Sequence, residues 1–208
     1  MYDPSREYIL GPVKCQRTCG LPSLGRVHYP QEGTAGRTVV TNPDMPKSDF
    51  RFSTPLRVRW AECDAQGIAF YGAYMGFLEI AQSEYFRHLG YSIYRIAETG
   101  YFDTVVAKAT LEYKASARVD DMLDLCTRVS HLGNTSMIMD SEIYRQEPEE
   151  LLLEAQLVYV GFDIALSSKK QVPRDIRAVV EEYEATGHVL PMTELPDLAR
   201  AASTGSIL

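Results

Sequence analysis

The stretch AECDAQGIAFYGAYMGFLEIA, residues 61–81, begins as a polar turn and continues as a long apolar run. Asp64 and Gly67 stand in the turn, and apolar side chains recur every three or four residues after it. This spacing continues beyond the stretch and predicts an amphipathic helix over 71–89, with Gly90 as its C-terminal glycine. The opposite face of the helix is predicted to be polar and to carry Glu79, Gln82, Ser83 and Arg87.

The segments on either side of this helix alternate with the period of β-strands. Before it, LRVRW (56–60) puts Leu56, Val58 and Trp60 on one face, the pattern of a half-buried strand. After it, alternating segments joined by short turns predict an antiparallel meander. These segments cover residues 105–114, 122–130, 137–145 and 151–163. A second, shorter helix is predicted over 173–184, with Pro173 at its start. A sheet and a helix that each have one apolar side bury both when the sheet wraps the helix, which predicts an α+β fold.

The composition is that of a globular protein and argues against nucleic-acid binding. Of 208 residues, 45% are hydrophobic and 24% are charged, and the net charge is -7. Nonspecific binding to nucleic acid needs an extended basic surface, which this balance does not supply. Even the apolar segment LLLEAQLVYVGF (151–162) contains Glu154 and Gln156 and is shorter than the roughly 20 residues needed to span a bilayer. Since the N-terminus also lacks a secretory signal pattern, we expect a cytoplasmic protein without integral membrane association.

The two ends of the chain differ in character from its centre. Residues 1–48 hold six of the eleven prolines without sustained periodicity, which predicts an irregular extension. Met45 precedes the first regular pattern, so we expect the functional domain to cover 49–184, followed by a tail over 185–208. A mitochondrial transit peptide is an alternative interpretation of the extension, against which Asp3 and Glu7 count, because such peptides avoid acids.

The cysteines do not form a recognisable metal site or disulfide framework. Cys15 and Cys19, in CQRTCG, have the spacing of half a metal site, but no second pair or histidine cluster completes it. Cys63 and Cys126 stand alone. We expect four reduced thiols.

The turn and helix of residues 61–81 resemble those of the hot-dog-fold acyl-CoA thioesterases. The pattern is similar to the 4-hydroxybenzoyl-CoA thioesterase family and to its branch associated with the Tol-Pal system. It consists of Asp64, Gly67, Ile68, Phe70 and Tyr71. Two further blocks follow in the family's order, LEYKASARVDD (111–121) and KKQVPRDI (169–176), so the resemblance covers about residues 50–183. It implies a hot-dog fold, in which an antiparallel five-stranded sheet wraps a long central helix.

The same resemblance implies hydrolysis of a CoA thioester to the free acid and CoA. Asp64 would act as the nucleophile or as the general base on water, and the Tyr71 main-chain N–H would hold the thioester carbonyl oxygen. No metal or other cofactor is implied. The residues alone also permit a structural role for Asp64 as a turn or capping residue, and for Gly67 as a plain turn glycine in place of one that lets the substrate approach.

Other candidate residues have two interpretations each. Glu79 either lines the acyl pocket, as the resemblance implies for one branch, or lies on the polar face of the helix. Lys169 and Lys170 either bind the CoA phosphates or are solvated loop residues. Cys63 stands beside Asp64 but has no evident histidine base, so a nucleophilic cysteine is disfavoured.

The resemblance also bears on assembly and on the main functional alternative. Hot-dog proteins generally pair their sheets across a dimer and build the site at that interface, which implies a homodimer or a tetramer of dimers. The alternative is a noncatalytic protein that binds acyl-CoA or acyl-carrier protein, or acts as a scaffold, with Asp64 in a structural role. Hydrolysis of CoA thioesters with release of free thiol separates the two classes.

Overall fold

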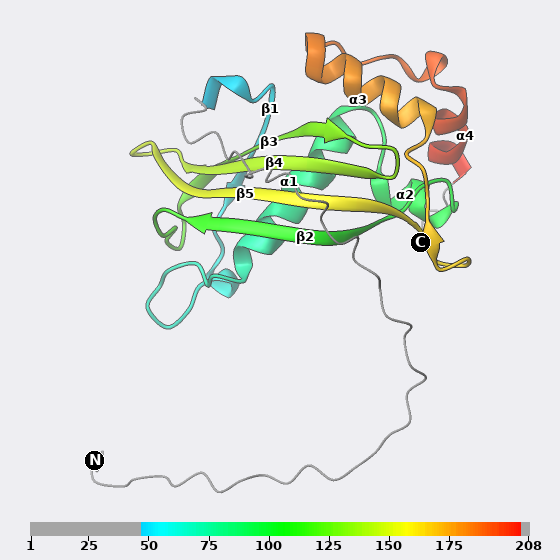
Figure 1. Ribbon diagram of the computed structural model, residues 1–208. Coiled ribbons are helices and arrows are strands. Elements are labelled where there is room, and N and C mark those ends of the chain that lie inside the picture. The colour runs from blue at the N-terminus through cyan, green and yellow to red at the C-terminus, as the bar shows by residue number, and fades with distance from the viewer. Residues whose placement is uncertain (1–46, 205–208) are drawn as a thin grey trace, which may run out of the picture. The chain divides into compact units, whose positions relative to one another are not determined.

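A computed structural model describes residues 47–204 (Figure 1). The predictions for residues 1–46, including the Cys15 and Cys19 half-site, lie outside this range. No helix within 47–204 is long and apolar enough to cross a membrane. The elements of the sheet and its helix follow one another as β1 (Phe52–Arg57), α1 (Ala73–His88), α2 (Ile93–Glu98), β2 (Thr104–Tyr113), β3 (Met122–Leu132), β4 (Ser136–Arg145) and β5 (Glu150–Asp163). The chain then adds the short strand β6 (Ser168–Lys169) and the helices α3 (Arg174–Thr186) and α4 (Pro196–Thr204).

The sheet is antiparallel and its strand order is β1-β3-β4-β5-β2, with β6 paired only to β5. The meander predicted after the helix is confirmed for β3, β4 and β5, which are neighbours in sequence and in space. β2 does not pair with β3 but crosses to the far side and pairs with β5, from Thr104 opposite Gly161 to Tyr113 opposite Leu153. β2 is therefore an edge strand of the sheet.

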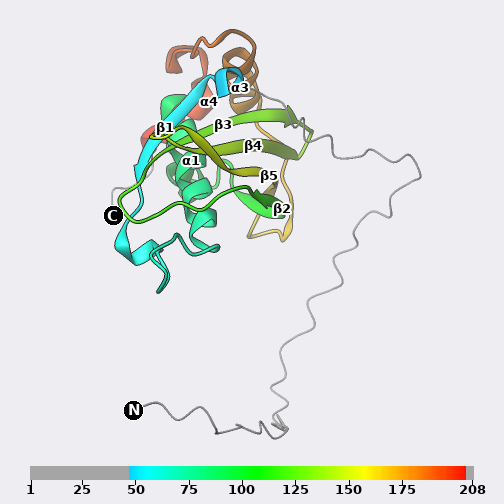
Figure 2. The ribbon, with the colours of Figure 1, turned by 90° about the vertical axis from the view of Figure 1, so that its left-hand side faces the viewer.

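Helix α1 lies against the inner face of the curved sheet, as predicted (Figure 2). Its apolar face is buried through residues spaced three or four apart, namely Tyr74, Phe77, Leu78, Ala81 and Tyr85. Alternate residues of the central strands form the opposite side of the core, among them Leu123, Leu125, Met139 and Leu157. The two periodicities thus meet in one hydrophobic core.

Two predictions about α1 are wrong in part. The helix begins at Ala73 and not at residue 71, so Tyr71 lies in the turn before it. Ser83 belongs to the predicted polar face but is only 5% exposed, and Gln82 is buried as well. The helix ends before Gly90, which has φ +97, as predicted. Ser83 is buried because the chain then returns as α2, where the Tyr94 hydroxyl forms a hydrogen bond with the Ser83 hydroxyl at 3.1 Å.

The predicted alternation of the first strand is wrong at Trp60, which is 78% exposed. β1 ends at Arg57, and residues Trp60–Glu62 form a 3-10 helix. The Glu62 carboxylate accepts a hydrogen bond from the Arg59 N–H at 2.7 Å and ion-pairs with the Arg59 guanidinium, which stabilises this helix. Asp64 is therefore not carried on a regular strand, as the alternation would require.

The C-terminal region contains a helix that the sequence analysis did not predict. α3 follows Pro173, as predicted, and runs to Thr186. Beyond it, α4 buries Leu198, and the Asp175 carboxylate accepts hydrogen bonds from the Asp197 and Leu198 N–H groups at 2.9 and 3.0 Å. This carboxylate caps the N-terminus of α4 and ties it to α3.

Candidate active site

The loop that carries Asp64 is a tight hairpin closed by main-chain hydrogen bonds. The Asp64 N–H donates to the Ile68 carbonyl at 2.9 Å, and the Gly67 N–H donates to the Asp64 carbonyl at 3.0 Å. One carboxylate oxygen of Asp64 accepts the Gln66 N–H at 2.8 Å. Gly67 has φ +74, a conformation that favours glycine, and its position has open space around it. The Asp64 side chain is thus oriented by its own loop and remains exposed in the single chain.

A second turn connects this loop to α1 and presents free amides. The Phe70 N–H donates to the Glu62 carbonyl, and the Ala73 N–H donates to the Phe70 carbonyl, each at 2.8 Å. Tyr71 and Gly72 occupy the two central positions of the turn. Within the described residues, 47–204, neither the Tyr71 nor the Gly72 N–H has a hydrogen-bond partner. These two donors precede the N-terminus of a 16-residue helix, whose dipole favours negative charge there.

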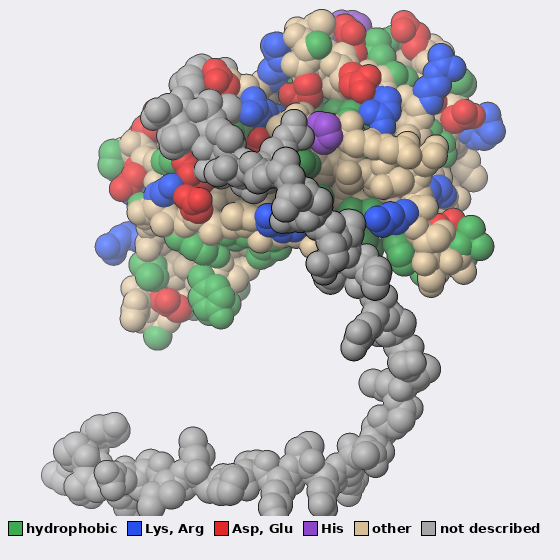
Figure 3. All heavy atoms as spheres, in the orientation of Figure 1, with side chains coloured by type: hydrophobic (Ala, Val, Ile, Leu, Met, Phe, Trp, Pro, Cys, Tyr) green, Lys and Arg blue, Asp and Glu red, His purple; other side chains and the backbone are tan. Residues whose placement is uncertain are grey.

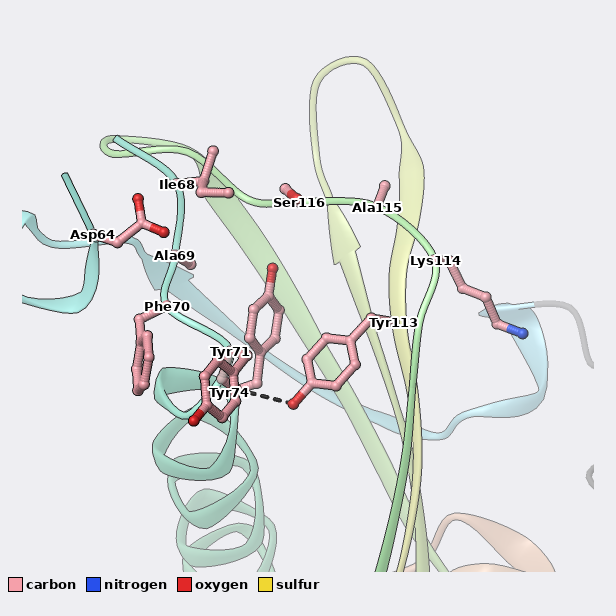
Figure 4. A pocket seen from close by; sticks show the side chains of 10 residues that line it. All are labelled: Asp64, Ile68, Ala69, Phe70, Tyr71, Tyr74, Tyr113, Lys114, Ala115 and Ser116. Carbon is pink, nitrogen blue, oxygen red and sulfur yellow. Dashed lines mark hydrogen bonds between the residues drawn. The ribbon is translucent and has the colours of Figure 1, made fainter. Parts of the chain in front are cut away.

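Asp64 and the turn open onto one pocket of about 360 Å³ (Figure 4). Asp64, Phe70 and Tyr71 line one side of it, and Tyr113 and Ser116 line the other. The structure therefore brings Asp64 and Tyr71 to one pocket, and the catalytic roles expected for them stay predictions. A carboxylate and a free main-chain N–H on residues that line one pocket can direct a nucleophile at a carbonyl carbon and stabilise the oxyanion that forms.

Tyr74 and Tyr113 are pocket residues that the sequence analysis did not identify. Tyr74 is 2% exposed, and its hydroxyl accepts the Ala117 N–H at 3.0 Å. Burial raises the pKa of Tyr74, so this phenol stays protonated. The Tyr113 hydroxyl donates to the Tyr71 carbonyl at 3.0 Å. The sequence did contain one signal for Tyr113, because this residue lies in the family block LEYKASARVDD. The resemblance assigned no role to any residue of that block.

Cys63 does not have the environment of a nucleophile. Its partial burial, together with the Glu62 and Asp64 carboxylates, raises the pKa of the Cys63 thiol. A thiolate is the reactive form of cysteine, and these surroundings disfavour it. Within the described residues, no group of histidine, cysteine and acidic side chains is arranged to hold a metal ion.

Glu79 lies away from the pocket wall in the single chain. It is exposed on α1, and its main-chain carbonyl accepts the Ser83 hydroxyl at 2.9 Å. Burial and the nearby Glu79 charge raise the pKa of the Tyr159 phenol on β5 to about 12. Glu79 is not among the residues that line the 360 Å³ pocket.

The two lysines predicted to bind phosphates lie at the far end of the sheet from Asp64. Lys169 pairs with Phe162, just beyond the Thr104 end of β2, whereas Tyr113 ends β2 at the pocket. The length of β2 between these ends is about 30 Å at roughly 3.3 Å per residue. Lys114 is the lysine at the pocket, but its ammonium is ion-paired with Glu112 and Glu154 at 3.0 and 2.9 Å. Figure 4 shows this ammonium pointing away from Asp64.

Comparisons with known proteins give one consistent result. Residues 66–161 match the family described as Thioesterase superfamily. The acyl-CoA thioester hydrolase YbgC of Escherichia coli O6:H1 is 35% identical over 128 residues, which cover 61% of this chain and 93% of that protein. The crystal structure of DHNA-CoA thioesterase from Staphylococcus aureus has a TM-score of 0.59 at 20% identity, covering 66% of this chain and 95% of that one. A 4-hydroxybenzoyl CoA thioesterase bound to 4-hydroxybenzoyl CoA has a TM-score of 0.57 at 22% identity, with coverage of 62% and 97%.

Proposed function

Because the chain belongs to the thioesterase superfamily and has its hot-dog fold, it is an acyl-CoA thioesterase, and we propose that Asp64 and the Tyr71 N–H act on the thioester carbonyl. One observation supports this assignment above the others: the same pocket is lined by Asp64 and by Tyr71, whose N–H has no partner in the described chain. Association with the Tol-Pal system stays a prediction from the sequence.

The reaction needs an attacking oxygen and a donor for the carbonyl oxygen. Asp64 either attacks the carbonyl carbon itself or removes a proton from the water that attacks it. In both cases negative charge develops on the carbonyl oxygen, where the Tyr71 N–H stabilises it and the Gly72 N–H lies next in the chain. The carbon–sulfur bond then breaks, and CoA leaves as the thiol. Gly67 contributes by giving the Asp64 loop its left-handed turn.

The experiment that tests the function measures thiol release from short-chain, long-chain and aromatic acyl-CoAs. We expect release of free CoA and of the matching acid in equal amounts from at least one class. Binding of acyl-CoA with no thiol release from any class would contradict the proposal and favour the noncatalytic binding protein. The acyl preference depends on how the pocket is completed, and Glu79 is our candidate for its distal lining.

We infer a homodimer from the free edge of the sheet. β2 is ten residues long, has no neighbour on its outer side among residues 47–204, and exposes Val105 and Val106, the latter by 51%. Figure 3 shows hydrophobic side chains along the lower edge of the molecule, where β2 runs in Figure 1. A long, apolar edge strand is a template for another strand, and a second copy of β2 satisfies it with two-fold symmetry. A tetramer of such dimers stays a prediction, as does the cytoplasmic location.

Antiparallel pairing of two β2 strands would also explain the placement of the lysines. The Thr104 end of one strand would lie beside the Tyr113 end of the other. Lys169 and Lys170 follow β5 at the Thr104 end, so each pair would approach the Asp64 pocket of the partner and not its own. The proposed phosphate site is therefore shared between two copies.

Replacing both lysines by alanine should raise KM about tenfold and change kcat little. Phosphate contacts far from the carbonyl stabilise the ground and transition states alike, and each exposed ion pair contributes up to about 1 kcal/mol. The measurement uses mixed dimers, isolated with two tags, of Asp64→Asn chains and Lys169→Ala/Lys170→Ala chains. If the lysines act across the dimer, one of the two sites is intact, and the mixed dimer has the wild-type KM at about half the wild-type kcat.

Three outcomes would contradict a phosphate site that is shared between two copies. If the lysines serve the pocket of their own chain, each site of the mixed dimer has one defect, and KM stays at the raised value. An unchanged KM in the homodimeric lysine variant at low and high salt would remove the lysines from the site altogether. A monomeric wild-type protein that hydrolyses acyl-CoA would contradict the shared site.

A further inference from the structure

The Tyr113 phenol joins the end of β2 to the turn that presents the free amides. Its hydroxyl donates to the Tyr71 carbonyl at 3.0 Å, across 42 positions of sequence (Figure 4). This bond reaches the peptide unit between Tyr71 and Gly72. A trans peptide is planar and points its C=O and N–H in opposite directions. A hydroxyl that fixes the Tyr71 carbonyl therefore also fixes the direction of the Gly72 N–H.

The Tyr113 ring is itself held in place. It packs edge-to-face on Tyr74, with ring centroids 5.4 Å apart and an interplanar angle of 86°. Tyr74 is buried on α1, and its hydroxyl accepts the Ala117 N–H, which ties the chain just after β2 to the helix. Tyr113 thus projects from a firm support, although its ring is half exposed on the pocket.

The other hydrogen bonds of the turn leave the Tyr71–Gly72 peptide unit without a partner. Phe70 is fixed through both its N–H and its carbonyl, and the Ala73 N–H is used by that carbonyl. Apart from the bond to Tyr113, the main-chain groups of Tyr71 and Gly72 make one hydrogen bond within the described residues, in which the Gly72 carbonyl accepts the Met75 N–H at 3.2 Å. Tyr113 supplies a constraint at the Tyr71 carbonyl, which lies between the two amides without partners. A hydroxyl bound to a carbonyl also polarises the peptide, which makes its N–H a stronger donor.

We infer that Tyr113 is a positioning residue for the oxyanion donors, acting through the main chain of Tyr71 and not through contact with the reacting atoms. The inference rests on the proposed function, because it assigns the task of these amides. It predicts an effect on the transition state that substrate binding does not share, since the ground-state carbonyl carries less charge than the oxyanion.

Tyr113→Phe keeps the ring and its packing on Tyr74 and removes only the hydroxyl. We expect kcat to fall about 5- to 10-fold, the range of one lost hydrogen bond, with KM and the unfolding midpoint close to wild type. Tyr183→Phe is the matched control. The Tyr183 hydroxyl also donates to a main-chain carbonyl, that of Arg51, at 3.0 Å, but it lies on α3 outside the pocket. Its removal should leave kcat unchanged.

A double-mutant cycle separates positioning from a general structural effect. Once Tyr71→Pro has removed one of the two donors and its ring restricts the turn at residue 71, Tyr113→Phe should reduce kcat by clearly less than in the wild-type background, because less of the turn still depends on the Tyr113 hydroxyl. Wild-type kcat in Tyr113→Phe, a raised KM in place of a lowered kcat, or equal effects in both backgrounds would each overturn the inference. All three results presuppose an active wild-type enzyme that needs Asp64. Failure of the proposed function would instead appear as no turnover by wild type or full turnover by Asp64→Asn.

Discussion

Asp64→Asn is expected to slow acyl-CoA hydrolysis by at least about 10²-fold at saturating substrate, the low end for loss of a positioned general base. The fold should be unaffected, because an asparagine oxygen can still accept the Gln66 N–H that now bonds the Asp64 carboxylate at 2.8 Å. What the substitution removes is the negative charge that attacks the carbonyl or takes a proton from water. The measurement is kcat by thiol release, together with the unfolding midpoint and the affinity for acyl-CoA.

The control for this experiment is Asp175→Asn. Asp175 also accepts main-chain N–H groups with one carboxylate oxygen, those of Asp197 and Leu198 at 2.9 and 3.0 Å, but it is on α3 outside the pocket. Its replacement should leave kcat near the wild-type value. Near-wild-type hydrolysis by Asp64→Asn would return Asp64 to the role of a turn residue.

The two roles open to Asp64 differ in where an oxygen atom goes. Attack by Asp64 forms a mixed anhydride with the acyl group, and its hydrolysis at the aspartyl carbon leaves an oxygen from water in the side chain. Direct attack by water places that oxygen in the product acid. Single-turnover hydrolysis in ¹⁸O water, followed by mass analysis of the peptide that contains Asp64, detects the first route by label in the protein.

Tyr71→Pro should lower kcat by about 10² to 10³, roughly 2.7 to 4 kcal/mol, the usual effect of losing one oxyanion donor. The structure gives a reason to expect that this variant folds. Tyr71 is the second residue of the turn closed by the Ala73 N–H and the Phe70 carbonyl, a position where proline is favoured. Its N–H has no partner in the described chain, so proline removes no hydrogen bond. The measurement is kcat of a variant whose circular dichroism and mass match wild type.

Tyr71→Ala is the matched control, because it removes the same exposed ring and its contact with Phe70 but keeps the N–H. We expect it to retain most of the activity. Equal losses in the proline and alanine variants would assign the effect to the ring. Undiminished kcat in a folded Tyr71→Pro variant would remove the amide from the mechanism, even if Asp64 proved essential.

Local patterns in the sequence predicted most of the fold, and tertiary contacts explain where they failed. The end of α1 at Gly90 and the start of α3 after Pro173 depend on the conformations that these residues favour. Trp60 was placed on the wrong face because the Arg59 and Glu62 pair closes a 3-10 helix that alternation does not register. Ser83 is buried because α2 returns along α1, a path that the polar pattern of α1 does not contain.

The candidate site was predictable where its parts are close in sequence. Asp64 and Tyr71 come together through two short turns that the motif itself encodes. Tyr113 joins them because β2 forms an edge of the sheet and ends beside α1, which alternation along β2 does not reveal. Lys169 could be identified only as a basic residue in a family block, and its distance from Asp64 follows from the strand order.

The central claim is that the thioester carbonyl binds the Tyr71 N–H beside Asp64, and the carbonyl stretch of bound substrate tests it most directly. Asp64→Asn can hold an acyl-CoA with a ¹³C-labelled thioester carbonyl long enough for isotope-edited infrared difference spectra. A hydrogen bond to the oxygen weakens the C=O bond and lowers its stretching frequency. We predict a lower frequency in Asp64→Asn than in Asp64→Asn/Tyr71→Pro, with both variants saturated by the ligand. The same frequency in the two variants would contradict the account.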